Sequence, residues 1–164
     1  MERISIGISK GCSLLDYVGE LGDIKVDELV EYSDDGYTRK VLYVDENIEV
    51  ILIGWEIGQS STIHDHPSNG CIYRILGGEM VEYRYNSKLN VESTTKLNVE
   101  STTKLNVEST TKLNVESTTK LKKGDIGNMM DNRYYHKMSN ESDVRASSLH
   151  IYSPPNYKMN IYGK

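Results

Sequence analysis

The sequence predicts an all-β fold, a barrel or a sandwich, preceded by short N-terminal helices. From position 37 onward, apolar residues no longer recur at helical spacing and instead form short runs of strand length. Turn-forming residues separate these runs, and no helical pattern alternates with them, which argues against a repeating βαβ architecture. The length of 164 residues suits one sizeable core, so we expect a single domain over residues 1–164.

Composition and charge argue against several classes of function. The net charge is −5 and no basic block is present, so the chain lacks the electrostatic footprint of a nucleic-acid-binding protein. No apolar run approaches the roughly 20 residues of a membrane-spanning helix, and the N-terminus lacks the apolar core of a signal peptide. Two cysteines are too few for a disulfide framework, which favours a reducing compartment. We expect a cytoplasmic monomer that binds neither nucleic acid nor membrane.

Two short helices are predicted before the strands. Ser13 is a suitable N-cap for a helix that ends at Gly22. A second helix would hold Val26, Leu29 and Val30. Each helix carries one apolar stripe, so both should pack on a sheet.

Seven apolar runs are predicted as strands. The run over residues 50–53 is continuous and mostly β-branched, which is typical of a strand covered on both faces. Gly77-Gly78 is a turn that joins its two neighbouring strands into a hairpin. The predicted strands cover residues 41–44, 48–53, 72–76, 80–85, 126–130, 134–138 and 144–153.

A perfect repeat interrupts this pattern. Lys88–Thr119 is KLNVESTT repeated four times without a change, and Lys120-Leu121 begins a fifth copy. Each unit is net neutral and has only weak strand character, whereas a solenoid unit is normally longer and more apolar. We therefore expect residues 88–119 to be a solvent-exposed insertion in a hairpin loop, either an extension of the hairpin or a loop, where extra length costs little closure entropy. The alternative is an integral part of the core.

The histidines are the candidate metal ligands. His64 and His66 lie two apart, so on a strand both imidazoles would point to one face and could begin a metal site. The two remaining histidines, His136 and His150, each lie in a strand-like stretch and could supply a third ligand. An H-x-H pair alone is equally compatible with surface or core histidines.

The spacing of glycines and histidines resembles the two motifs of the cupin superfamily, whose fold is a small jelly-roll-like β-barrel with the metal inside. The matching positions are Gly58, His64, His66, Cys71 and Gly78 in the first motif, and His136 and Asn140 in the second, where Gly124 lies one residue early. The chain departs from the motifs at Asp131 and Arg133, where Pro and Gly are usual. Cys71 replaces the usual Glu, and this replacement points to the cysteine dioxygenase branch.

Separated segments of the chain resemble cysteine dioxygenase in the same order. SSTIHDH at Ser60–His66 is similar to its metal-binding segment, and Cys71 lies at the position of its crosslinking cysteine. Tyr37–Arg39 is similar to its substrate-carboxylate segment, and Ser148–Pro155 to its C-terminal strand. The resemblance runs over about Tyr37–Pro155, with the repeat interrupting it.

This resemblance implies that His64, His66 and His136 hold one Fe(II). Three neutral imidazoles leave three open positions on an octahedral ion, enough for a bidentate aminothiol and O₂. Composition leaves Zn open, since Zn also accepts three histidines and a water. The implied activity is the oxidation of L-cysteine by O₂ to cysteine sulfinic acid, with a small thiol and O₂ as the partners.

The resemblance also implies roles for other residues. Arg39 would hold the substrate carboxylate as a bidentate fork, assisted by Tyr37, although a lone Arg after a turn is usually a surface charge. Ser148, His150 and Tyr152 share one strand face and would form a relay beside the metal. Cys71 would be joined to Tyr152 by a thioether, or would simply be a buried residue. Trp55 would be a wall of the pocket or a core residue.

Two other functions remain open. One is the oxidation of another small thiol acid, such as 3-mercaptopropionate; enzymes resembling that group tend to carry Gln at the Arg39 position, so Arg39 favours cysteine. The other is a non-catalytic metal-binding cupin, which the repeat insertion keeps open because it could spoil the pocket.

Overall fold

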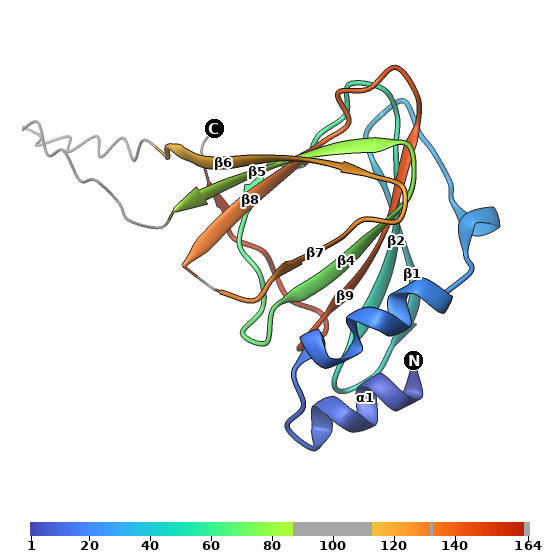
Figure 1. Ribbon diagram of the computed structural model, residues 1–164, viewed down its shortest axis with the longest axis vertical. Helices are drawn as coiled ribbons and strands as arrows, with labels where there is room; N and C mark the ends of the chain where they lie inside the picture. Colours follow the sequence, from blue (N-terminus) through green and yellow to red (C-terminus); the bar gives the residue numbers. More distant parts are fainter. Residues whose placement is uncertain (87–112, 132, 163–164) are drawn as a thin grey trace, which may run out of the picture.

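The computed structural model describes residues 1–86, 113–131 and 133–162 of the chain. Within these residues, two five-stranded antiparallel sheets face each other and form a barrel (Figure 1). The first sheet contains, in spatial order, β1 (Thr38–Val44), β2 (Glu49–Trp55), β9 (Ala146–Tyr152), β4 (Cys71–Gly77) and β7 (Ile126–Met129). The second contains β10 (Ile161–Tyr162), β3 (Ile63–His64), β8 (Tyr134–Ser139), β5 (Glu79–Asn86) and β6 (Val115–Lys122).

Strand β2 separates two hydrophobic clusters. Ile51, Ile53 and Trp55 face the barrel interior, whereas Val50 and Leu52 face the cluster that the N-terminal segment covers. All of these side chains are buried, which explains why the run lacks polar alternation. The prediction of a strand covered on both faces is confirmed.

Helix α1 (Glu2–Ser9) and the 3₁₀ helix η1 (Leu14–Asp23) lie against the outside of the first sheet (Figure 1). The 3₁₀ helix η2 (Asp27–Leu29) buries none of its own residues, and Leu29 is 47% exposed, so the prediction that Leu29 packs on the sheet is wrong. Only Val26 and Val30, on either side of η2, pack against the same cluster. Ser13 caps η1 as predicted, and Asp16 completes a capping box by accepting a hydrogen bond from the Ser13 backbone N–H at 2.9 Å. In the described part of the chain, no helix combines the length and the apolar character that crossing a membrane would require.

All seven predicted strands are present, with ends that differ by a few residues. The last five residues of the repeat segment, Val115–Thr119, belong to β6 and extend the hairpin, which is one of the two forms predicted for this segment. These residues pair with β5, as Tyr83 does with Thr118, while their side chains stay exposed. This part of the repeat therefore joins the sheet through backbone pairing rather than through burial of its side chains. Residues 88–112 of the insertion lie outside the described residues, so their placement in a loop stays a prediction.

Candidate metal centre and adjoining pocket

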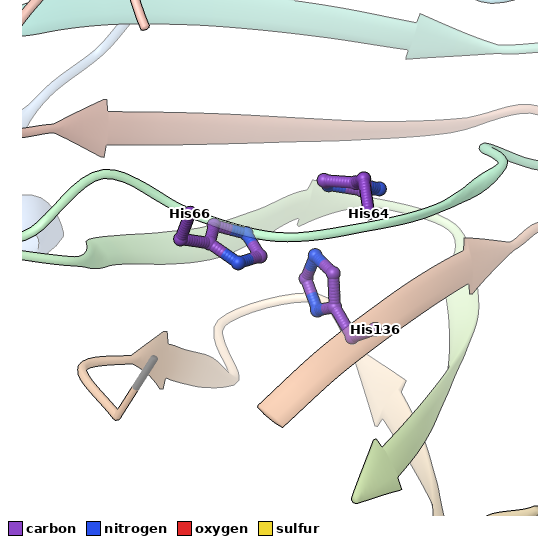
Figure 2. A group of neighbouring side chains, drawn as sticks. All are labelled: His64, His66 and His136. Atoms are coloured by element: carbon purple, nitrogen blue, oxygen red, sulfur yellow. The ribbon is translucent and has the colours of Figure 1, made fainter. Parts of the chain in front are cut away.

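Three histidines meet inside the barrel, with their rings turned toward one another (Figure 2). His64 ends β3, His136 lies opposite it on β8, and His66 follows in the loop after β3. One nitrogen from each ring lies within 4.8 Å of the others, and all three residues are buried. The strand expected to carry both residues of the H-x-H pair ends at His64, so His66 reaches the site from a loop.

The ring nitrogens of these histidines have different partners. His64 Nδ1 lies 2.9 Å from the Thr62 carbonyl oxygen, and His136 Nδ1 lies 2.8 Å from Glu82 Oε1, which leaves each Nε2 available. Both ring nitrogens of His66 are buried without a hydrogen-bond partner among the described residues. A buried polar atom without a partner is destabilising, and a bound metal ion would supply one. The donor set therefore fits a metal ion.

Burial keeps His64 and His66 uncharged. Burial and the neighbouring His136 lower the pKa of His64 to about 3, and the same causes hold the pKa of His66 well below its usual value. Neutral imidazoles are good ligands because protons do not compete with the metal at neutral pH. Three of them suit a transition-metal ion such as Fe(II) or Zn.

His150 lies on β9 outside this cluster and has partners on both nitrogens. Its Nε2 is 2.8 Å from Ser148 Oγ, and its Nδ1 is 3.4 Å from Tyr152 Oη. Trp55 Nε1 donates to Ser148 Oγ at 3.0 Å. Because an indole can only donate, the Ser148 proton is free to reach His150 Nε2, which leaves Nδ1–H facing Tyr152. The prediction for Trp55, a pocket wall or a core residue, did not include this hydrogen bond.

Cys71 and Tyr152 lie side by side on adjacent strands of the first sheet. They are paired residues of β4 and β9, and both belong to the interior cluster. The Cys71 Sγ lies 3.9 Å from His150 Nδ1. Burial raises the pKa of both the Cys71 thiol and the Tyr152 hydroxyl far above their usual values, so both groups stay protonated.

A small pocket opens beside the histidines. Arg39 lies at this pocket on β1, with its guanidinium carbon 5.9 Å from the centre of the Tyr152 ring. Arg39 is exposed and makes no hydrogen bond or ion pair with any described residue. Tyr37 stacks on Trp55 with ring centres 4.6 Å apart and forms another wall. The structure thus brings the predicted substrate residues together with two of the candidate ligands, His64 and His136, at one cavity.

A buried layer of charged side chains, which was not predicted from the sequence, lies behind His136. Glu82 is 2% exposed and accepts hydrogen bonds from His136 and, at 2.9 Å, from Arg84 Nε. Burial alone would raise the pKa of Glu82, but these two hydrogen bonds lower it to about 2, so the carboxylate is ionised. The spacing in the sequence could have indicated this layer. Glu82 and Arg84 lie two and four residues after the core residue Met80 on β5, so all three side chains point to the same face of the strand.

Asp65, between the two histidines, holds the segment that follows β9. Its carboxylate accepts hydrogen bonds from the Asn160 backbone at 2.8 Å, the Asn160 side chain at 2.7 Å and the Tyr162 hydroxyl at 3.2 Å. Tyr162 belongs to β10, which pairs with β3. These contacts fix the short segment that carries His64 and His66.

Comparison with known proteins gives a family and a fold. A family model described as cysteine dioxygenase type I matches residues 25–164. A conserved protein with a double-stranded β-helix domain from Klebsiella pneumoniae shares 20% identity, covers 86% of this chain and 96% of its own, and has a TM-score of 0.60. A Thermus thermophilus protein shares 20% identity over 80% of this chain and 96% of its own, with a TM-score of 0.56. A cupin superfamily protein from Desulfitobacterium hafniense shares 14% identity, and the match covers 79% of this chain and 88% of that protein, with a TM-score of 0.54. At these identities the structures show the fold alone, a cupin barrel, which confirms the predicted fold class.

Proposed function

Because the chain belongs to the cysteine dioxygenase type I family, we propose that it oxidises L-cysteine with O₂ to cysteine sulfinic acid at one Fe(II). The family and the cupin fold support a thiol dioxygenase-type function. The observation that carries the finer proposal is the buried cluster of three imidazoles beside a pocket with an unpaired guanidinium.

His64, His66 and His136 would hold the metal. When bound, Fe(II) would supply coordination positions for the substrate thiol, its amine and O₂, and the electrons that activate O₂. Imidazole ligands bring no negative charge to the metal, unlike the two-histidine and carboxylate set of most Fe(II) oxygenases. A substrate thiolate is therefore the natural anionic ligand for this site.

Arg39 would hold the substrate carboxylate. Its guanidinium has no competing partner among the described residues, and its planar fork matches a carboxylate with two hydrogen bonds. Anchoring the carboxylate at the pocket mouth would turn the thiol and amine of cysteine toward the histidines. This orientation is the main contribution that binding can make to the rate.

Tyr152 would donate a hydrogen bond into the pocket. The chain from Trp55 through Ser148 to His150 directs an N–H toward the Tyr152 oxygen, so the phenol proton is free to point elsewhere. Because burial raises its pKa, the phenol remains a donor at neutral pH. A thioether to Cys71, which the family resemblance implies, would hold the ring still.

The overall reaction adds both oxygen atoms of O₂ to one sulfur and requires no external reductant. We expect the protein loaded with Fe(II) to consume O₂ with L-cysteine and, under ¹⁸O₂, to form sulfinic acid that carries two labelled oxygens. His136→Ala, which removes a ligand, is the control. A preference for 3-mercaptopropionate over cysteine would reassign the substrate. Bound metal with no turnover of any thiol would indicate a non-catalytic cupin.

A further inference from the structure

Glu82 and Arg84, two neighbouring inward residues of β5, form an ion pair directly behind the candidate ligand His136. We propose that they act as a charge-balanced positioning pair for His136. Glu82 fixes the ring of the ligand, and Arg84 both holds Glu82 and cancels its charge.

The contact between Glu82 and His136 sets which nitrogen faces the metal. Glu82 Oε1 lies 2.8 Å from His136 Nδ1, and the two residues are 2% and 1% exposed. An ionised carboxylate can only accept hydrogen bonds, so Nδ1 carries the proton and Nε2 is left as the ligand atom. A carboxylate in this position also makes an imidazole a better ligand.

Arg84 ties this carboxylate to both sheets of the barrel. Its Nε donates to Glu82 Oε2 at 2.9 Å, and its Nη2 donates to the carbonyl oxygen of Asn128 at 2.7 Å. Asn128 belongs to β7 of the first sheet, whereas Arg84 faces His136 across the β5–β8 ladder of the second. The guanidinium is therefore held in place at two points, and Glu82 cannot turn away from His136 without breaking the ion pair.

Charge balance is the second part of the proposal. Alone, Glu82 would place a full negative charge one imidazole away from the metal. With Arg84 beside it, the pair adds no net charge to three neutral imidazoles. The consequence for catalysis rests on the proposed function. If the protein groups around the metal carry no net charge, they do not reduce the attraction between the metal ion and the substrate thiolate.

The test measures Co(II) binding to the metal-free protein, using Co(II) alone as the probe. We expect Glu82→Gln to weaken Co(II) binding by roughly 10- to 100-fold. Arg84→Gln should instead tighten it, by about tenfold, because the carboxylate charge is no longer balanced. Arg84→Lys keeps the charge and should remain close to wild type. The matched controls are Glu56→Gln and Arg145→Gln, which alter an ion pair of 2.7 Å at the surface and should leave Co(II) binding unchanged.

A second readout is the tautomer of His136 in ¹⁵N spectra of the metal-free protein. We expect the Nδ1–H form in wild type and Arg84→Gln, and a mixture in Glu82→Gln, because an amide can also donate. The proposal is overturned if Glu82→Gln and Arg84→Gln shift Co(II) affinity in the same direction, as a purely structural role would, or if wild-type His136 carries its proton on Nε2. Neither readout uses cysteine or O₂, so a failure of the proposed function leaves this test intact.

Discussion

His66 and His150 are both buried histidines, but their ring nitrogens have opposite surroundings. His150 is satisfied on one side by Ser148 and on the other by Tyr152, whereas neither nitrogen of His66 has a partner among the described residues. A buried imidazole with satisfied nitrogens needs no metal, and one without partners does. The structure thereby separates the candidate ligands from the fourth histidine, which spacing in the sequence left open.

This difference predicts how metal binding responds to substitution. Replacing His64, His66 or His136 by Ala should reduce bound iron from about one atom per chain to nearly none, because two imidazoles rarely hold such an ion alone. His150→Ala should retain the iron and lose activity. Metal analysis of the four purified variants checks this prediction. Iron loss confined to His150→Ala would reverse the ligand assignment.

Arg39 should determine which thiols are accepted. The two charge-assisted hydrogen bonds of an Arg–carboxylate fork are worth roughly 1.5–3 kcal/mol each, so Arg39→Ala should lower kcat/KM for cysteine by about 100-fold or more. Cysteamine lacks the carboxylate and should be a poor substrate that is insensitive to this change. Arg39→Lys should restore activity only in part, since an ammonium lacks the planar fork. Oxygen uptake at matched iron content provides the comparison, and an equal loss for both thiols would remove Arg39 as the carboxylate anchor.

At the scale of elements, local patterns were enough for the longer strands and for the cap of η1. Strand β2 was recognisable from a continuous apolar run, and Ser13 from its position before an apolar stripe. Strands β3 and β10 have two residues each, which is too short for any periodic pattern. The contact of Glu82 with His136 was out of reach because it depends on the register between β5 and β8, which no local pattern encodes.

The repeat shows how an element can depend on copy number. In the ladder of β5 and β6, Val81 pairs with Lys120 and Tyr85 with Val115. Removing all four copies joins Ser87 directly to Lys120. Val81 could then pair with Lys120 only if residues 82–87 became the hairpin loop, which would take Glu82 and Arg84 out of the strand. One remaining copy would restore the whole of β6.

We therefore predict different outcomes for two deletions. Deleting residues 88–111 leaves one copy and a five-residue connection between Tyr85 and Val115, so Tm and metal affinity should stay close to wild type. Deleting residues 88–119 should lower Tm by roughly 5 °C or more and weaken metal binding. Thermal unfolding and Co(II) titration of both proteins make the comparison. Equal behaviour of the two deletions would show that β6 is dispensable.

For the whole molecule, the site exists only where the two sheets face each other. The candidate ligands come from the second sheet and the loop after β3, whereas Arg39, Trp55 and the relay from Ser148 to Tyr152 come from the first. The sequence indicated these residues through family resemblance and spacing, but it did not show which sheet each strand joins. Enclosure between the sheets also buries several titratable groups, which links the stability of the metal-free protein to pH.

His64, His66 and His150 set the direction of this dependence. Burial lowers the pKa of His64 to about 3 and holds the pKa of the other two well below their usual 6.5. The unfolded chain therefore binds protons below about pH 6.5 that the folded protein does not bind. Stability must fall as the pH falls through 6.5. One proton bound only by the unfolded state corresponds to 1.36 kcal/mol per pH unit, so three predict a loss of about 4 kcal/mol between pH 7.5 and 5.5.

Urea unfolding of the metal-free protein at pH 7.5, 6.5 and 5.5 measures this loss. His150→Gln removes one of the three titrating groups, so its loss over the same range should be about two-thirds of the wild-type loss, whatever its stability at pH 7.5. Because His150 is not a candidate ligand, the comparison isolates proton binding from metal binding. A wild-type free energy of unfolding that stays constant over this range would mean that the imidazoles take up protons while the barrel remains closed. Water would then reach them in the folded protein, and the dry interior on which the neutral ligand set depends would not exist.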